Sequence, residues 1–179
     1  MLGRKEDTTL SPSAVKRLLR DWEEVRSNPL PTISAAPLQD DLQEWHCNLC
    51  PSDGPYAGAT FHLELHFPSN YPLQPPVVKL RCRTLKHPNV FSHYGSGWGD
   101  GYPGICLDML NGGERATSSS YSGWSSAYTV HSILLQLQSF LFGESVEQDY
   151  GGRMSMEEYT CESAVARTRE EVLGFRWEP

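Results

Sequence analysis

The chain has 179 residues, of which 39% are hydrophobic and 21% are charged, and this composition suits one compact globular domain with its own core. Its formal net charge of −7 gives no electrostatic support to nucleic-acid binding. No apolar run approaches a membrane span, and residues 1–10 lack the apolar stretch of a signal peptide. The five cysteines show no disulfide-scaffold spacing, so we expect a reducing compartment, the cytoplasm or the nucleus.

The first predicted element is a helix that begins at Pro12, because Ser11 can cap it and proline suits the first helical position. Five apolar residues then recur at helical spacing and predict its buried stripe: Val15, Leu18, Leu19, Trp22 and Val25. Pro29 is expected to end this helix, because proline cannot continue it.

Three strands are predicted next, at residues 42–50, 59–67 and 77–82, and their close succession predicts antiparallel pairing. The second strand alternates most clearly, with one apolar face formed by Phe61, Leu63, Leu65 and Phe67. Its other face carries His62 and His66, which we expect to be solvated. Their separation of roughly 13 Å along the strand is too large for one metal ion.

Cys47 and Cys50 form a lone Cys-x-x-Cys pair, a spacing that occurs in zinc and redox sites. A separation of three residues in a strand puts the two thiols on opposite faces of the sheet. We therefore expect small core or edge residues here rather than a metal site. The glycine-rich stretch at 95–101 is not followed by Gly-Lys-Ser/Thr, so it does not predict a phosphate site.

Two segments rich in glycine, 92–104 and 111–123, flank a short apolar block at 105–110, and we expect them to be the most mobile internal segments. The strongest predicted helix follows them, and its apolar face consists of Ile133, Leu134, Leu137, Phe140 and Leu141. A last helix is predicted from Ser155 to Gly174.

Cys106 lies in the apolar block between the two glycine-rich segments. A free cysteine in such a place is either a small buried hydrophobic residue or, if it is accessible, a nucleophile. Spacing and polarity alone leave both interpretations open.

The motifs that surround Cys106 resemble the signature of ubiquitin-conjugating enzymes, and the likeness covers about residues 12–142. The matching segments are a first strand at 39–45, a proline-rich loop at 71–76, His87-Pro88-Asn89, the active-site block at 104–108 and Trp124-Ser125. Their combination in this order is specific to the family, although no single piece is.

The resemblance implies an α+β fold, the UBC fold. Its elements are an N-terminal helix, a four-stranded antiparallel meander, the active-site segment and C-terminal helices. It also implies a core domain at residues 11–143, preceded by a polar extension at 1–10 and followed by a divergent, partly helical segment at 144–179.

The resemblance also assigns catalytic roles. Cys106 is expected to carry ubiquitin as a thioester, and the Asn89 side chain is expected either to donate to the oxyanion or to brace its loop. His87 and Pro88 are expected to be structural. Asp149, or the glutamine before it, resembles the acidic gate that helps to orient and deprotonate the lysine. No metal or organic cofactor is expected, because the activating enzyme uses the ATP.

Partner surfaces follow from the same resemblance. Basic residues of the first helix match the face that meets the activating enzyme, although a merely solvated face fits as well: Lys16, Arg17 and Arg20. Leu73 stands where ligase-binding members often carry an aromatic residue, and Ser126 stands where a proline is usual, so ordinary ligase pairing is in doubt. Ser34 resembles the back face where some members bind a second ubiquitin. The expected partners are ubiquitin, its activating enzyme, a ubiquitin ligase and a substrate lysine, without nucleic acid or membrane.

The chain departs from the family pattern on both sides of the active site. Seventeen positions separate Asn89 from Cys106, and eighteen separate Cys106 from Trp124, each about double the family's usual spacing. Two other functions are alternatives: a non-catalytic ubiquitin-binding adaptor, and conjugation of another ubiquitin-like protein. A cysteine hydrolase has no support, because no histidine stands in a motif that would pair it with the thiol.

Overall fold

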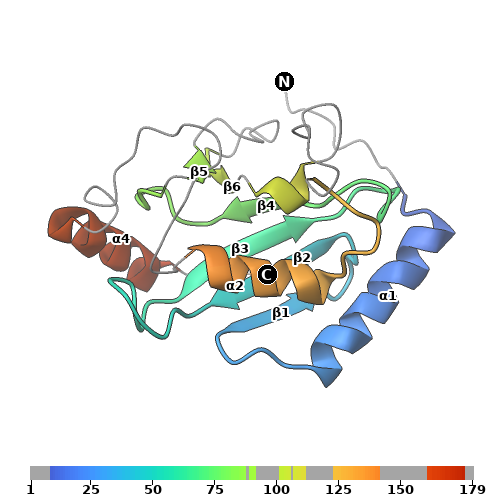
Figure 1. The fold of residues 1–179 in the computed structure, drawn as a ribbon, viewed down its shortest axis with the longest axis horizontal. Coiled ribbons are helices and arrows are strands. Elements are labelled where there is room, and N and C mark those ends of the chain that lie inside the picture. The colour runs from blue at the N-terminus through green and yellow to red at the C-terminus, as the bar shows by residue number, and fades with distance from the viewer. Residues whose placement is uncertain are drawn as a thin grey trace.

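The computed structural model describes residues 9–87, 89–91, 101–105, 107–111, 123–141 and 161–175. Its helices are α1 (Pro12–Ser27), the short 3-10 helix η1 (Asp108–Leu110), α2 (Val130–Leu141) and α4 (Glu162–Gly174). Its strands are β1 (Ile33–Pro37), β2 (Glu44–Leu49), β3 (Phe61–His66), β4 (Val77–Leu80), β5 (Val90–Phe91) and β6 (Gly104–Ile105) (Figure 1). In this described part, no helix is both long and apolar enough to cross a membrane.

The strands of the described residues form one antiparallel sheet with the order β1-β2-β3-β4-β6-β5. The first four strands run as a meander, α2 covers one face of it, and α1 lies beside it (Figure 1). The predicted α+β fold is therefore confirmed. One detail was wrong: the strand that carries Trp45 was expected to be the first. Instead β1 precedes this strand, and every residue of β1 pairs with it.

The core lies between the sheet and α2. Alternation in β2 and β3 sends every second side chain inward, and the six that are at most 1% exposed are Trp45, Cys47, Leu49, Phe61, Leu63 and Leu65. From α2, the side chains that are at most 1% exposed are Val130, Ile133, Leu134, Leu137 and Leu141. The predicted apolar faces of these elements are thus confirmed for the described side chains.

The first helix begins as predicted, because the Ser11 hydroxyl accepts a hydrogen bond from the N–H of Ala14 at 3.2 Å. Its fully buried positions are Ala14, Leu18 and Asp21. Leu19 was predicted to belong to the buried stripe, but it is 53% exposed. The charged Asp21 takes an inward position instead, because the hydroxyl of Tyr71 donates to its carboxylate at 2.7 Å.

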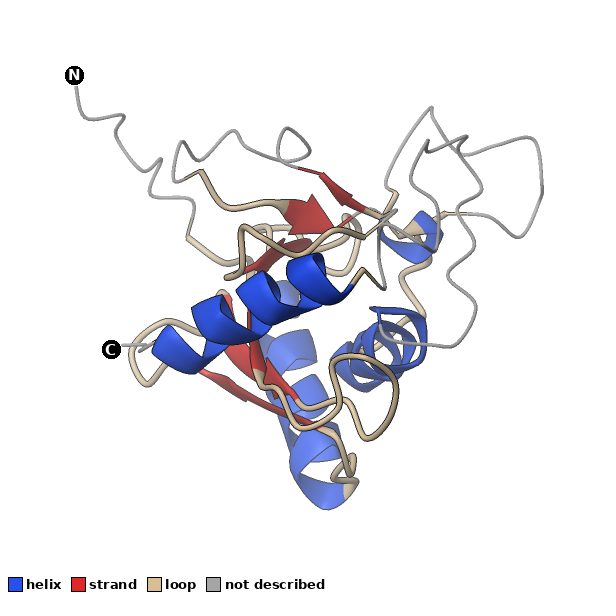
Figure 2. Cartoon of the chain, turned by 90° about the vertical axis from the view of Figure 1, so that its left-hand side faces the viewer, coloured by secondary structure: helices blue, strands red, loops and turns tan. Residues whose placement is uncertain are grey.

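The last helix crosses one end of the sheet. The helix that leads to the C-terminus in Figure 2 runs from the α2 side toward the opposite face. It begins at Glu162 with Cys161 as its N-cap residue, so the predicted start at Ser155 was wrong for this helix. Ser155 itself lies outside the described residues, whereas Gly174 is the last helical residue.

Glu171 fastens this helix to the chain that follows β4. One carboxylate oxygen accepts from the N–H of Arg83 at 2.8 Å, and the other accepts from the N–H and the hydroxyl of Thr84 at 2.8 and 2.6 Å. Burial opposes ionisation of this carboxyl, but these hydrogen bonds outweigh it and lower the pKa of Glu171.

Glu171→Ala should lower the free energy of unfolding by about 2–3 kcal/mol, because several donors lose a charged acceptor at once. Urea unfolding followed by tryptophan fluorescence measures this loss. The matched control is Glu170→Ala, an exposed position on the same helix, which should cost less than about 0.5 kcal/mol. Equal losses in the two variants would contradict the anchoring role of Glu171.

Candidate active site

Two short strands bring the predicted catalytic motifs together. Val90 of β5 pairs with Ile105 of β6, and these residues adjoin Asn89 and Cys106 in the sequence. The segments that carry the two predicted catalytic residues therefore meet at this ladder. Three predicted site residues lie outside the described part of the chain: Pro88, Cys106 and Asp149.

His87 holds the turn that leads into β5. It is 1% exposed, its Nδ1 accepts from the N–H of Asn89 at 3.0 Å, and its carbonyl accepts from the N–H of Val90 at 3.1 Å. Burial lowers the pKa of His87 to about 4, although a hydrogen bond with the backbone of Leu141 opposes this. The ring is therefore neutral at physiological pH, and it orients Asn89, which is itself 8% exposed.

Acid should destabilise the protein through His87. In the unfolded chain the His87 ring binds a proton below pH 6.5, whereas in the native state it stays neutral until the pH approaches 4. Stability therefore falls as the pH drops through this window, by up to about 1.4 kcal/mol per pH unit. His62, whose pKa burial also lowers to about 4, adds a dependence in the same window, so His87→Gln should reduce the slope by one proton and leave that of His62, as urea unfolding at several pH values would measure. His131→Gln, at a partly exposed position of α2, should keep the wild-type slope, and an unchanged slope in His87→Gln would refute the assignment.

The second insertion is tied at its base. The Asp108 carboxylate accepts from the N–H of Gly123 at 3.0 Å, and the carbonyl of Asn111 accepts from the N–H of Trp124 at 2.9 Å. Residues 112–122 lie outside the described part of the chain. The insertion therefore leaves and rejoins the domain at one point, directly after the active-site block.

The first insertion contacts the sheet at its end, where an aromatic residue was a candidate to hold it against the domain; the mobility of 92–104 stays a prediction. The ring of Tyr102 lies 4.4 Å from the guanidinium of Arg81 and 4.2 Å from that of Arg83. Such cation–π contacts favour a fixed ring position. Residues 92–100 lie outside the described part of the chain.

The predicted basic face of α1 is divided. Lys16 and Arg20 are exposed, whereas Arg17 turns inward. Its guanidinium donates to the Asp21 carboxylate at 2.9 Å and to the carbonyl of Ser126 at 2.8 Å. Arg17 thus joins α1 to the loop of Ser126, while Lys16 and Arg20 present their charges to the outside.

The predicted ligase-facing residues lie on two joined loops. The indole N–H of Trp124 donates to the carbonyl of Pro72 at 2.8 Å, which connects the loop before β4 to the loop before α2. Leu73 is 73% exposed on the first loop, and Ser126 is exposed on the second. Together with the contact from α1, these bonds gather the predicted partner residues at one end of the domain.

Ser34 lies on the sheet face opposite α2. It pairs with Asn48 of β2, which pairs in turn with His62 of β3. His62 was predicted to be solvated, but it is 5% exposed and its two ring nitrogens lie 2.9 Å from Asn48 Oδ1 and 2.7 Å from His46 Nδ1. Burial lowers the pKa of His62 to about 4. Strand spacing alone could not reveal this contact, because the partner lies on another strand.

His66 is also less exposed than predicted, since 14% of its side chain is accessible. Its Nε2 lies 3.0 Å from Glu64 Oε2, and the same oxygen accepts a hydrogen bond from Arg81 at 2.7 Å. Burial opposes ionisation of Glu64, but the hydrogen bonds from His66 and Arg81 lower its pKa to about 2. The face opposite α2 is therefore a bonded polar layer rather than a solvated surface.

Comparisons with known proteins agree with this architecture. A sequence model of the family described as ubiquitin-conjugating enzyme matches residues 17–169. Among solved structures, that of human ubiquitin-conjugating enzyme E2 G1 is similar, with a TM-score of 0.58 and 30% sequence identity over 73% of this chain and 95% of that chain. The family match covers most of the sequence, including α2, the whole sheet and the Asn89–Cys106 region. The chain belongs to the ubiquitin-conjugating enzyme family.

Proposed function

We propose that the chain is an active enzyme that accepts ubiquitin as a thioester on Cys106 and transfers it to a lysine. The observation that carries the proposal is the pairing of Val90 with Ile105, because it joins the segment of Asn89 to the segment of Cys106. A thiol nucleophile and an amide donor are the two groups that acyl transfer through a tetrahedral intermediate requires.

Charging is a thioester exchange. The Cys106 thiolate attacks the carbonyl carbon of ubiquitin that the activating enzyme holds as a thioester. A new carbon–sulfur bond forms, the old one breaks, and the activating enzyme's cysteine leaves as a thiolate. The activating enzyme uses the ATP, so this step needs no metal or organic cofactor in the chain itself.

Discharge transfers the acyl group to nitrogen. The neutral amine of a substrate lysine attacks the same carbonyl, and the Asn89 amide donates to the oxyanion that develops. The Cys106 thiolate then leaves, and the amine loses a proton to water, guided by Asp149 or the glutamine before it. His87 supports this step by position, because its Nδ1 already accepts from the N–H of Asn89.

The surface residues define the proposed partners. Lys16 and Arg20 meet the activating enzyme, and Leu73 with Ser126 forms the surface for a ligase that does not depend on the usual proline. Ser34 marks the face on which a second ubiquitin binds without a covalent bond. The four described cysteines are free thiols, and the reaction needs a free thiol, so we propose that the enzyme acts in the cytoplasm or the nucleus.

The test is a charging assay with a panel of activating enzymes, each supplied with ATP and its own modifier. We expect one ubiquitin per chain, in a bond that a thiol reductant cleaves, as seen on non-reducing and reducing gels. Charging by another modifier alone would replace ubiquitin in the proposal. No charging by any member of the panel, together with measurable ubiquitin binding, would identify a non-catalytic adaptor.

A further inference from the structure

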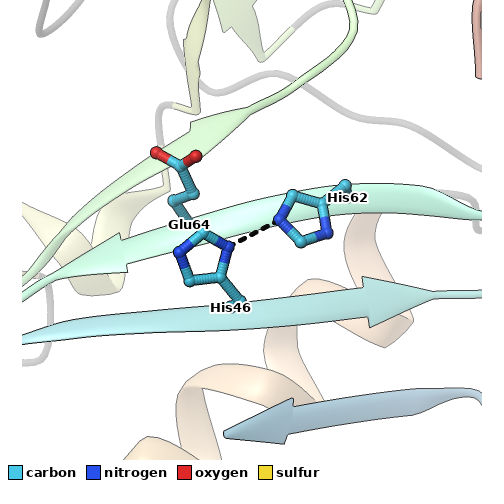
Figure 3. Close-up of side chains that lie close together, drawn as sticks. All are labelled: His46, His62 and Glu64. Carbon is cyan, nitrogen blue, oxygen red and sulfur yellow. Dashed lines mark hydrogen bonds between the residues drawn. The ribbon is translucent and has the colours of Figure 1, made fainter. Parts of the chain in front are cut away.

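The sheet face opposite α2 carries a second group of reactive side chains. It consists of His46 from β2 with His62 and Glu64 from β3, and Figure 3 shows the two rings turned toward each other. One nitrogen of each ring and a carboxylate oxygen all lie within 4.8 Å of one another. The β5–β6 ladder lies beyond β4 at the other edge of the sheet, so this group is separate from the proposed acyl-transfer site.

The outer nitrogen of each ring already faces an acceptor. His62 Nδ1 lies 2.9 Å from Asn48 Oδ1, and His46 Nε2 lies 3.1 Å from Glu44 Oε1. Amide and carboxylate oxygens accept hydrogen bonds, so each outer nitrogen lies where such an oxygen can accept from its N–H.

This pattern determines what the inner nitrogens need. In two neutral rings with protonated outer nitrogens, His46 Nδ1 and His62 Nε2 both present lone pairs to each other. They lie only 2.7 Å apart, and a metal ion with an affinity for imidazole that stands between them accepts both lone pairs.

We propose that His46 Nδ1, His62 Nε2 and one oxygen of Glu64 form a binding site for a divalent transition metal, with Zn²⁺ as the fitting ion. Imidazole and carboxylate are common zinc ligands, and a tetrahedral ion at about 2.0–2.1 Å from two nitrogens holds them about 3.3 Å apart. The rings therefore have to separate by about 0.6 Å. Water completes the coordination.

The surroundings of the rings support this assignment. Histidines that bind metals almost always donate their other N–H to an oxygen acceptor, which fixes the ring orientation. Asn48 and Glu44 occupy these positions before any metal binds. On the outside of the group, the ring of Phe175 stacks on His62 at 5.2 Å between centroids, so a bound ion would link β2 to β3 beneath the residue that follows α4.

Glu64 needs a small rearrangement to join the site. Arg81 holds both oxygens of this carboxylate, because its Nε donates to Oε1 at 2.5 Å and a terminal nitrogen donates to Oε2 at 2.7 Å. His66 Nε2 lies 3.0 Å from Oε2. Each carboxylate oxygen carries two lone pairs, so Oε1 can offer its second lone pair to the ion beside its bond from Arg81 Nε, while Oε2 keeps the terminal nitrogen of Arg81. A hydrogen bond that holds the second oxygen is the usual support for a ligating carboxylate.

The test uses the full chain freed of metal by a chelator. Calorimetric titration with Zn²⁺ should give one ion per chain, and Co²⁺ should give visible bands of a tetrahedral site without a sulfur-to-metal charge-transfer band. Asn48→Leu keeps all three ligands, so it should weaken binding by roughly 10–100-fold. His46→Gln and His62→Gln should each weaken it further.

Two controls make these results decisive. His131→Gln, at a partly exposed position of α2, should bind Zn²⁺ as the wild type does, and thermal unfolding of each metal-free variant checks that it is folded. If a histidine variant fails to fold, Asn48→Leu carries the test. Unchanged affinity in Asn48→Leu or in a folded His62→Gln would overturn the proposal. A sulfur charge-transfer band would also overturn it. So would a result in which His66→Gln loses Zn²⁺ binding while His46→Gln keeps it.

Discussion

Cys106→Ala should gain no ubiquitin when it is incubated with activating enzyme, ATP and ubiquitin, whereas the wild-type chain should gain one. In the proposed mechanism the acyl group is transferred to the sulfur of Cys106, so removing this thiol removes the proposed acceptor. The wild-type adduct should disappear on a reducing gel. Cys106→Ser is expected to give an ester that resists the reductant, since an oxygen replaces the sulfur.

The other cysteines provide matched controls with different surroundings. Cys47 and Cys82 are buried, and burial raises the pKa of both thiols, to about 11 for Cys82; both should be unreactive. Cys50 and Cys161 are exposed, and hydrogen bonds from Ser163 and the start of α4 lower the pKa of Cys161. Cys161 is therefore the strongest described competitor, yet Cys161→Ala should charge normally. Charging that survives in Cys106→Ala and is lost in Cys161→Ala would reassign the nucleophile.

Asn89→Ala should charge nearly normally but discharge onto free lysine far more slowly. In charging, much of the machinery belongs to the activating enzyme. In discharge, this chain must stabilise the oxyanion itself, and the loss of one such donor typically costs about 2.7–4 kcal/mol, or roughly 10²–10³ in rate. Single-turnover discharge of the purified thioester, followed on non-reducing gels, measures the effect.

Two further measurements separate catalysis from bracing at this position. Asn89→Asp should not restore discharge, because a carboxylate offers no donor and repels the developing negative charge. Asn89 is 8% exposed and its N–H bonds to His87, so the melting temperature of each variant must be compared with that of the wild type. A lower melting temperature with charging and discharge impaired together would support bracing. Unchanged discharge in a stable variant would refute the oxyanion role.

The sequence predicted the elements whose pattern depends on burial. Alternation identified β2 and β3, and helical spacing identified α2, because the apolar residues of each element recur on the one face that packs into the core. It missed β1, whose Ile33-Ser34-Ala35-Ala36-Pro37 holds small residues and a proline and becomes a strand only by pairing with β2. It missed β5 and β6 for a similar reason, since two residues are too few to show a period.

The sequence predicted some features of the candidate site and missed others. The motif order placed Asn89 and Cys106 in one site, and the structure pairs the residues next to them. By contrast, Arg17 was predicted to face a partner, but its contacts with Asp21 and Ser126 draw it inward. The contact between His46 and His62 was not predicted, because the register between two strands is set by the folded sheet and is not visible in either strand alone.

The thioester on Cys106 is tested most directly by locating ubiquitin on the charged wild-type chain by peptide mass spectrometry, under conditions that preserve thioesters. We predict one ubiquitin per chain, attached to the peptide that contains Cys106 and released by a thiol reductant. Three results would contradict this account. The first is an adduct on another cysteine, and the second is no adduct from any activating enzyme. The third is an adduct on lysine that resists the reductant and forms without Cys106.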